Sequence, residues 1–260
     1  MILAVRDLEK TFGSLVAARD INVAVPALQV VGIIGANGAG KTTFVNMITG
    51  HLRPSKGSIW FEGREITGRP TREITRLGIS RSFQVAQVFP SLTVFENMRA
   101  ASAIARSAGA ILKSALTALQ SPATMAEAEA ALELFGIARY RDEHASKLPQ
   151  GVRKLLDIAM AVAGSPRVLL LDEPTSGISL EEKFSLMDVV MAALKERRIT
   201  VLFVEHDMEI VERYAERVFA FYDGTVIADG PPVETLENPR IQELISGPKL
   251  KVSAPAAGHA

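Results

Sequence analysis

Residues 35–42 carry the pattern best suited to binding phosphate. They read GANGAGKT, fit G-x-x-x-x-G-K-[ST], follow the apolar run 30–34 and precede a segment that favours helix. Glycines let the backbone fold closely around a phosphate chain, toward which successive N–H groups and a helix N-terminus point. We expect Lys41 to reach the β- and γ-phosphates of a nucleotide and the Thr42 hydroxyl to ligate Mg²⁺.

The residues expected to line this nucleotide site form one continuous run. They are Gly35, Ala36, Asn37, Gly38, Ala39, Gly40, Lys41, Thr42 and Thr43. Phe12, in a turn near the N-terminus, has two candidate roles: packing in the core or turn, or offering a flat ring on which adenine stacks. The residues alone leave this choice open.

Polar residues end two continuous apolar runs further along the chain. The run 168–171 ends in Asp172 and Glu173, and the run 200–204 ends in EHD at 205–207. Continuous apolar runs are typical of parallel strands covered by helices on both faces. Ligands of such sheets gather at the carboxyl ends of the strands, so these polar residues are candidates for the same site.

The pattern predicts an α/β fold: a P-loop NTPase core with a mainly parallel sheet, an N-terminal antiparallel β subdomain and an inserted α-helical subdomain. Residues 2–25 alternate as antiparallel strands do, and 57–63 adds another strand. Between 94 and 163 strand patterns vanish and alanine-rich helical patterns replace them. We place the core with its β subdomain at 1–93 and 164–247, the helical subdomain at 94–163 and a flexible tail at 248–260.

Shorter signals mark individual elements. Thr124 and Glu127 have the spacing of a helix-starting capping box, and Gly136 lies where that helix would end. Residues 218–229 predict a hairpin turning at Asp223-Gly224.

Gln84 follows a short predicted strand at 79–83. An amide in this position is either an ordinary loop residue or part of the site, and spacing alone does not decide between them.

Composition excludes several classes of function. The chain has 260 residues, a formal net charge of zero and no cysteine, so it offers no overall positive charge to nucleic acid, no disulfide and no catalytic thiol. Its start lacks the basic-then-apolar form of a signal peptide, and no uncharged apolar run is long enough to cross a bilayer. We therefore expect any work at a membrane to be done through partners.

In this order the motifs resemble the ATP-binding subunit of an ABC transporter over nearly the whole chain. The matching segments are GANGAGKT (35–42), Gln84 after ISRSF, LPQGVRKLLDIAMA (148–161), VLLLDEPTSG (168–177) and FVEHD (203–207). The resemblance implies that the activity is ATP hydrolysis and that the cofactors are ATP and Mg²⁺.

The resemblance also implies a role for each polar residue. Asp172 would hold Mg²⁺, Glu173 would orient or deprotonate the attacking water, and His206 would contact the γ-phosphate. Gln84 would sense the ligand near Mg²⁺ and the water. The implied catalytic residues are therefore Glu173, His206, Gln84 and Lys41, and the implied metal-binding residues are Thr42, Gln84 and Asp172.

The segment 148–152, LPQGV, departs from the family signature LSGGQ. Leu148 and Gly151 agree, but Pro149 replaces the serine whose hydroxyl would contact the γ-phosphate bound by the opposite subunit. What remains is a helix start, whose N–H groups and positive end still suit an anion, and proline suits the first turn. We therefore include Gln150 and Gly151 among the nucleotide-binding residues.

Two further features refine the resemblance. Ser179 stands where most relatives carry aspartate, which bears on contacts across a dimer interface. The proline in the signature, the segment 83–98 and the ending at 237–247 resemble the ATPases of branched-chain amino acid importers.

The resemblance implies a dimer with two ATP molecules sandwiched between subunits. The implied partners are a second ATPase subunit (the same or a sister chain), transmembrane permease subunits and, indirectly, a substrate-binding protein, with no nucleic acid. The chain would lie peripherally on the cytoplasmic face of the inner membrane. Two alternatives stay open: a regulatory partner that binds ATP with little hydrolysis, and a soluble ABC ATPase outside transport. A small-molecule kinase or GTPase is disfavoured because it would not need the LPQG segment, and the chain has no N-K-x-D sequence that reads guanine.

Overall fold

The N-terminal part of the protein is an antiparallel sheet. A computed structural model describes residues 1–82, 87–107, 119 and 121–246. The sheet has the order β2-β1-β4-β5, with β1 (Leu3–Phe12), β2 (Leu15–Val25), β4 (Lys56–Phe61) and β5 (Arg64–Glu65). The antiparallel strands predicted for 2–25 and 57–63 are confirmed.

A second sheet of six strands forms the centre of the molecule, in the order β10-β9-β3-β8-β7-β6. Its strands are β3 (Val30–Gly35), β6 (Ile79–Ser82), β7 (Val168–Asp172), β8 (Thr200–Val204), β9 (Arg217–Tyr222) and β10 (Thr225–Gly230). All neighbouring pairs are parallel except β9 with β10, which form the predicted hairpin. Its turn residues Asp223 and Gly224 both have positive φ, 45° and 76°, as a tight hairpin turn requires.

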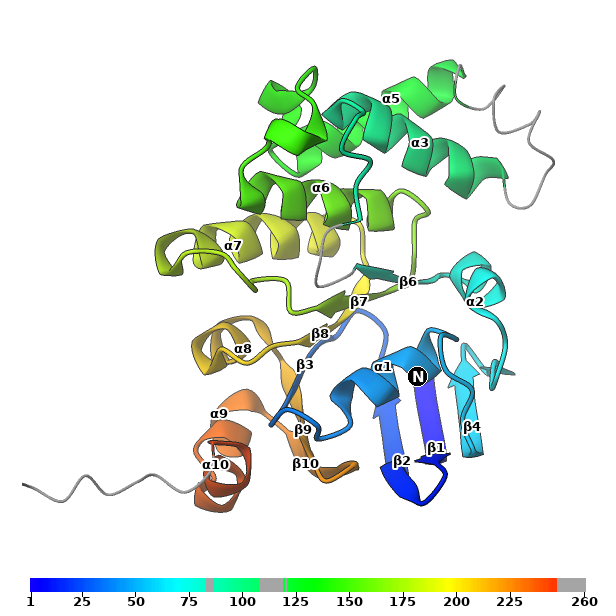
Figure 1. The fold of residues 1–260 in the computed structure, drawn as a ribbon, viewed down its shortest axis with the longest axis vertical. Helices are drawn as coiled ribbons and strands as arrows, with labels where there is room; N and C mark the ends of the chain where they lie inside the picture. Colours follow the sequence, from blue (N-terminus) through cyan, green and yellow to red (C-terminus); the bar gives the residue numbers. More distant parts are fainter. Residues whose placement is uncertain (83–86, 108–118, 120, 247–260) are drawn as a thin grey trace, which may run out of the picture.

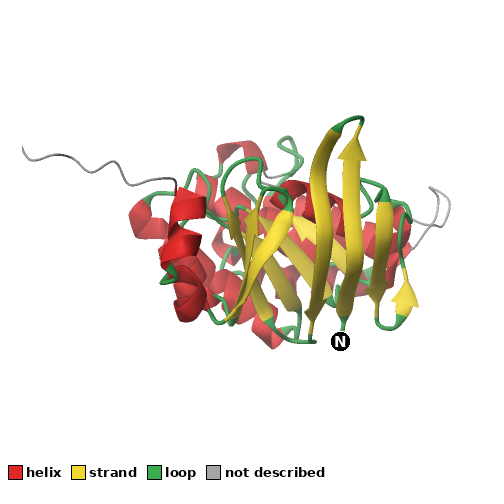
Figure 2. Ribbon diagram, turned by 90° about the horizontal axis from the view of Figure 1, so that it is seen from below, coloured by secondary structure: helices red, strands yellow, loops and turns green. Residues whose placement is uncertain are grey.

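The helices begin and end as follows. They are α1 (Lys41–Ile48), α2 (Thr71–Leu77), α3 (Val94–Ser107), α5 (Pro122–Leu134), α6 (Gln150–Val162), α7 (Leu180–Glu196), α8 (Met208–Tyr214), α9 (Pro232–Leu236) and α10 (Pro239–Ser246). Figure 1 shows α3, α5 and α6 stacked above the six-stranded sheet, α8 beside β8 and β3, and α9 and α10 near the β9–β10 end. Seen from below in Figure 2, the strands of the two sheets lie toward the viewer, with helices behind them and to their left. In the part of the chain that the structure describes, no helix is both long and apolar enough to span a bilayer.

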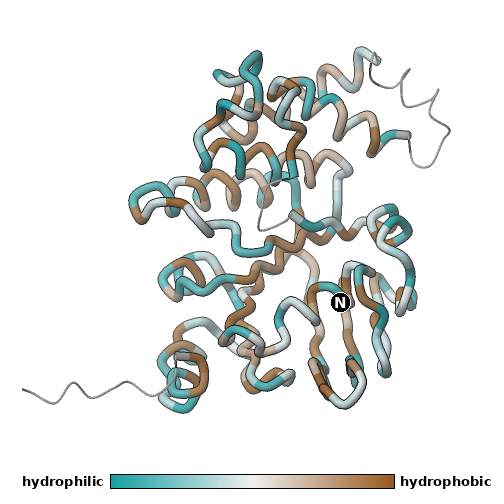
Figure 3. The backbone as a smooth tube through the Cα atoms, viewed as in Figure 1, coloured by the Kyte–Doolittle hydropathy of each residue, from teal (hydrophilic) through white to brown (hydrophobic). Residues whose placement is uncertain are grey.

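The apolar strand runs are continuous because both faces of the central sheet are buried. In β7, Leu169 and Leu171 face the core formed with α3, α5, α6 and α7, whereas Val168 and Leu170 face the core formed with α1 and the antiparallel sheet. Burying both faces removes apolar surface from water on each side of every strand. Figure 3 shows the resulting hydrophobic band through the middle of the molecule.

The helix predicted from Thr124 begins earlier than expected. The residue before α5 is Ser121 and the helix starts at Pro122, so Thr124 is fully buried inside it and is not its cap. Proline at the first position explains the shift, since its missing N–H would have no partner there anyway. Glu127 instead pairs with Arg106 at 2.5 Å. The predicted end is confirmed: Gly136 has a φ of 66°, and its N–H donates to the carbonyl of Glu133.

The helices α3, α5 and α6 all lie within 94–163, but the boundaries of that subdomain stay a prediction. The predicted tail at 248–260 lies outside the described residues.

Candidate functional site

The phosphate loop, residues 35–42, connects β3 to α1. Lys41, only 6% exposed, donates from Nζ to the carbonyl oxygens of Gly35 (2.7 Å) and Ala36 (3.0 Å). The N–H of Ala39 donates to the carbonyl of Ala36 at 3.1 Å, which closes the loop into a tight turn. The lysine side chain therefore folds back over the loop, as a group that binds a phosphate chain inside it must.

Two glycines of the loop are required by what surrounds them. Gly35 has a φ of 152°, and a Cβ added there would lie 2.5 Å from the carbonyl oxygen of Phe221. Gly40 has a φ of 100°, and a Cβ would lie 2.9 Å from the carbonyl oxygen of Ala17 and 3.1 Å from Cα of Gly224. The N–H of Gly224 also donates to the carbonyl of Ala39 at 3.0 Å. Backbone from the β9–β10 hairpin and from β2 thus holds the loop in shape.

The polar residues after β7 and β8 form what we call the strand-end corner, residues 172–175 and 205–207. β7 and β8 pair in register up to Asp172 and Val204, and the N–H of Glu173 continues the ladder to the carbonyl of Val204 at 3.0 Å. Nε2 of His206 lies 3.0 Å from Oε1 of Glu173. The structure thus brings together two of the residues predicted to be catalytic.

The strand-end corner lies beside the phosphate loop. Burial lowers the pKa of Lys41, and the negative charges of Glu173 and Asp172 oppose that effect. Burial likewise lowers the pKa of Lys154 on α6, against the charges of Asp157, Asp172, Glu205 and Glu173. Both lysines are thus poorly solvated and interact with Asp172 and Glu173, and charged groups interact more strongly in such surroundings than in water.

Asp172 has a cationic partner within the protein. Its Oδ2 accepts a hydrogen bond from Nη2 of Arg81, whose Nη1 also donates to Oδ1 of Asn46 at 2.6 Å. Both side chains of the ion pair are largely buried, 9% and 13% exposed. Arg81 lies at the end of β6 and connects that strand end with β7 and α1.

The oxygen donors available here suit magnesium. Within the described ranges no group of three or more His, Cys, Asp or Glu side chains could hold a metal ion by itself. Thr42 supplies a solvent-exposed hydroxyl and Asp172 a carboxylate. Mg²⁺ binds through a few hard oxygen ligands and keeps several waters, so this donor set fits it, whereas a soft metal would need other ligands.

Phe12, at the end of β1, is 50% exposed, and Nζ of Lys10 lies 5.0 Å from the centre of its ring. An exposed ring does not contribute to a core, so the structure favours the stacking role over the packing role. Gln84 lies outside the described residues.

The helix start predicted at 149–152 exists, but it lies on the other face of the sheet from α1. α6 begins at Gln150, preceded by Pro149 as its cap residue, so the proline stands just before the first turn. Apolar residues of α6 belong to one core and those of α1 to the other. The Gln150 amide packs against Gly177 of the same chain, where an added Cβ would lie 2.2 Å from Nε2.

Sequence reasoning missed two residues that organise this site, Arg81 and Lys183. It placed Glu205 at a strand end near the site but gave it no role. Glu205 gave a usable signal, since it follows a predicted buried strand, whereas Arg81 lies within the predicted strand 79–83 and gave none. Lys183 gave none, because it reads as an ordinary surface residue of a helix, yet it is 5% exposed and forms an ion pair with Asp207.

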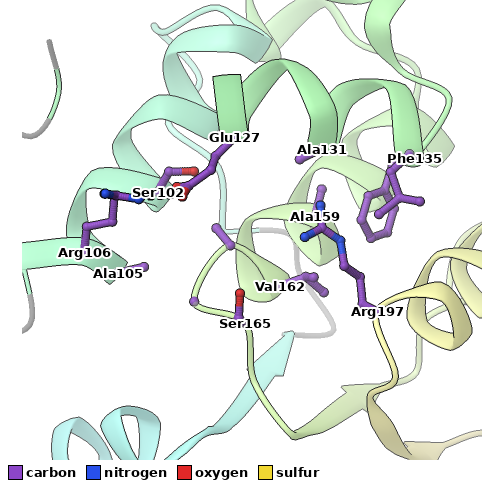
Figure 4. A pocket seen from close by; sticks show the side chains of 13 residues that line it. Ser102, Ala105, Arg106, Glu127, Ala131, Phe135, Ala159, Val162, Ser165 and Arg197 are labelled. Carbon is purple, nitrogen blue, oxygen red and sulfur yellow. Dashed lines mark hydrogen bonds and ion pairs between the residues drawn. The ribbon is translucent and has the colours of Figure 1, made fainter. Parts of the chain in front are cut away.

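A cavity of about 230 Å³ lies elsewhere, between α3, α5 and the far end of α6 (Figure 4). Arg106 and Glu127, which pair across it, and Arg197 supply its charge. None of the predicted site residues lines it. We therefore do not assign the nucleotide to this cavity.

Several relatives resemble the chain along almost its full length. It is 33% identical to a probable branched-chain amino acid transport ATP-binding protein LivG of Archaeoglobus fulgidus over 246 residues, covering 95% of both chains. It is 31% identical to the high-affinity LivG protein of Escherichia coli (strain K12), covering 92% of this chain and 95% of the relative. Identity to the BraF protein of Pseudomonas aeruginosa is 33%, with the same coverage.

Solved structures lead to the same family. An ATP-binding cassette of an ABC transporter in its ADP conformation superposes with a TM-score of 0.84 and 29% identity, covering 95% of this chain and 99% of that one. A nucleotide-free ATP-binding cassette superposes with a TM-score of 0.80 and 28% identity, covering 94% and 98%. The matching folds confirm the predicted α/β class. Because residues 18–176 also match the ABC transporter family itself, the chain belongs to the ATP-binding subunits of that family.

Proposed function

We propose that the chain hydrolyses ATP and thereby powers a membrane importer of branched-chain amino acids or a related small polar solute. The observation that carries the enzymatic part is the contact between Glu173 and His206, 3.0 Å apart beside the phosphate loop. The transport part is supported by relatives whose names describe branched-chain amino acid transport.

The proposed reaction divides between binding and hydrolysis. Main-chain N–H groups of the phosphate loop and Lys41 bind the phosphates, and Phe12 stacks on the adenine. Glu173 orients or deprotonates the attacking water, and His206 holds Glu173 and contacts the γ-phosphate. Thr42 and Asp172 would hold Mg²⁺, which would neutralise charge on the phosphates.

Arg81 also orients Asp172. The largely buried guanidinium pairs with the Asp172 carboxylate and holds it at the end of β7.

The proposed assembly is a dimer on transmembrane permease subunits, at the cytoplasmic face of the membrane. Each nucleotide would lie between the phosphate loop of one ATPase subunit and residues 149–152 of the other, which is either the same chain or a sister chain. A substrate-binding protein would act only indirectly, through the permease.

The loop that precedes α3 suits contact with a permease. Phe89 is 48% exposed, while its N–H and carbonyl are both held by the side chain of Asn97, at 2.8 and 3.1 Å. Asn97 is fully buried, and Asp157 of α6 accepts from the N–H of Gln87 at 2.8 Å. The loop thus presents an apolar ring from a fixed backbone, as a docking contact requires.

Replacing Glu173 by glutamine tests the enzymatic proposal. We expect ATP binding measured by calorimetry to stay within about twofold and phosphate release to fall by about 100-fold or more, because the amide cannot accept the proton of water. Glu73→Gln, at an exposed glutamate on α2, is the control and should change neither. ATP binding by the unaltered chain without phosphate release, alone and with partners, would favour the regulatory alternative.

A further inference from the structure

We propose that Glu205 is a positioning residue for ATP hydrolysis, whose buried carboxylate ties the segment carrying Glu173 to the segment carrying His206. The inference rests on the proposed function. Glu205 itself touches neither nucleotide nor water in this scheme and acts through its two neighbours.

The backbone of Glu205 lies between β3, which leads into the phosphate loop, and β7, which leads into Glu173. It follows β8, and its N–H donates to the carbonyl of Ile33 in β3 at 3.2 Å. On the other side of β8, Val204 accepts from the N–H of Glu173 at 3.0 Å. Glu205 therefore stands where the sheet ends, between the strand that leads into the phosphate loop and the strand that leads into Glu173.

The side chain of Glu205 is a bridge. Its Oε1 accepts from both the N–H and the hydroxyl of Thr175, at 2.9 and 2.6 Å, and its Oε2 accepts from the N–H of His206 at 3.2 Å. Glu205 is 3% exposed and Thr175 is 8% exposed. A carboxylate this deeply buried requires several donors, and here the donors come from the two segments of the strand-end corner.

The hydrogen bonds of Glu205 to Thr175 also constrain the backbone at Glu173. Glu173 has a φ of 47°, a left-handed conformation that a residue with a side chain adopts only when its surroundings impose it. Thr175 lies two residues further along, in a turn closed by the N–H of Ser176 to the carbonyl of Glu173 at 3.1 Å. By holding Thr175, Glu205 holds this turn and so keeps the Glu173 side chain directed at His206.

A carboxylate suits this bridge and an amide does not. Each oxygen of Glu205 accepts, whereas glutamine would offer one accepting oxygen and one NH₂ group that must face either Thr175 or His206 N–H. On whichever side the NH₂ group faces, it would meet an N–H donor, and the hydrogen bond on that side would be lost. Glu205→Gln therefore loosens one segment while keeping the size of the side chain.

The experiment compares Glu205→Gln with two variants of its partner, Thr175→Val and Thr175→Ser. Serine keeps the hydroxyl donor and valine keeps only the shape. We expect kcat for ATP to fall about tenfold in Glu205→Gln and severalfold in Thr175→Val, with Thr175→Ser close to the unaltered chain. KM and the Kd for nucleotide should stay within about twofold in all three, because the phosphate loop is untouched.

Measuring turnover in the Glu173→Gln background separates a positioning role of Glu205 from a merely structural one. In the Glu173→Gln background, adding Glu205→Gln should cause no further loss of residual turnover, since the group being positioned is already gone. A full additional tenfold loss there, or equal kcat for Thr175→Val and Thr175→Ser, would overturn the inference. If Glu205→Gln fails to fold, the two threonine variants still decide it.

The two proposals fail in different ways. If the unaltered chain hydrolyses ATP and Glu205→Gln hydrolyses it equally fast, the positioning role is wrong and the proposed function stands. If the unaltered chain binds but does not hydrolyse ATP, alone or with partners, the proposed function is wrong and the positioning role is overturned with it.

Discussion

The phosphate loop and the strand-end corner meet at one site but are held in place by different parts of the chain. Backbone holds the loop: carbonyls of Phe221 and Ala17 and the turn at Gly224 lie so close that only glycine fits at Gly35 and Gly40. Side chains hold the corner: Arg81 pairs with Asp172, Glu205 bridges to Thr175, and Lys183 pairs with Asp207.

This difference determines how each region responds to change. A region packed by backbone is damaged by one added carbon atom, whereas a region held by charged side chains is damaged by removing a charge or by altering pH. The same difference makes the phosphate loop, where phosphate is proposed to bind, the more rigid of the two regions. The residues proposed for hydrolysis depend instead on contacts that a small shift of either strand end would change.

The largest effect is expected at Gly40. In Gly40→Ala, the left-handed backbone and the contact with Ala17 together should lower the free energy of unfolding by about 3 kcal/mol. ATP binding should be lost, because the loop must move away from the β9–β10 hairpin to make room. Urea unfolding and calorimetry measure the two effects.

Gly38→Ala is the matched control. Gly38 also has a positive φ, 81°, but an added Cβ would meet nothing within 4 Å. It should therefore lose only the backbone contribution, about 1 kcal/mol. Equal destabilisation in the two variants would show that the surrounding backbone does not hold the loop.

The contrast between the phosphate loop and the strand-end corner also explains which features could be predicted from the sequence. The phosphate loop was predictable because its glycines, Lys41 and Thr42 occur together in one short segment. Both sheets were predictable because continuous and alternating apolar patterns have different burial. The start of α5 was not, because Ser121-Pro122 and Thr124 offered competing signals for the first residue of the helix.

The supports of the strand-end corner could not be predicted for a physical reason. Arg81 meets Asp172 across 91 positions of the chain, and Lys183 meets Asp207 across 24. A single charged residue carries no pattern that identifies its partner, so such pairs become visible only when the strands are placed side by side. The roles of Glu173, His206 and Asp172 came from family resemblance, and the structure places the first two in contact.

An intermediate effect is expected from Lys183→Met in the strand-end corner. Lys183 is 5% exposed, and the side chain of Asp207 is 28% exposed, so removing the ammonium should cost about 2 kcal/mol of unfolding free energy at pH 7. Partial burial pushes the pKa of Asp207 upward, but Lys183 and the N–H groups of Glu209 and Ile210 outweigh it and hold the pKa below its usual range.

The lowered pKa fixes the direction of the pH dependence. A carboxyl whose folded pKa is depressed contributes stability above its unfolded pKa and loses it as pH falls toward the folded value. The gap between the unaltered chain and Lys183→Met should therefore be constant from pH 7 to 5 and shrink below about pH 4. Urea unfolding at pH 7, 5 and 3.5 measures it. A gap as large at pH 3.5 as at pH 7 would remove Asp207 as its source.

The control for this prediction is an ion pair whose lysine is exposed. Lys56, whose side chain is 72% exposed, lies 3.1 Å from Glu9, whose side chain is 25% exposed. Lys56→Met should change the unfolding free energy by less than about 0.5 kcal/mol at every pH, because water screens the charge of the lysine.

The smallest effect, and one of opposite sign, is expected at Gly151 in the first turn of α6. An added Cβ there would lie 3.9 Å from Cδ1 of Leu186, an ordinary contact. Gly151→Ala should therefore stabilise the isolated chain by about 0.5 kcal/mol, since alanine favours helix over glycine. Nothing within the described part of this chain then requires glycine at this position, in contrast to Gly40.

If glycine matters at 151, the reason must lie outside the subunit, where the proposed dimer brings the nucleotide of the other chain against this helix start. Gly151→Ala should then lower ATP turnover severalfold while raising stability. Gly164→Ala is the matched control, since its added Cβ would lie 3.8 Å from Cβ of Ala105, beyond the far end of α6, and it should leave turnover unchanged. Unchanged turnover in Gly151→Ala would mean that this helix start does not face a nucleotide. Phosphate binding would then be left to the phosphate loop, whose glycines are required by the backbone around them and not by a partner subunit.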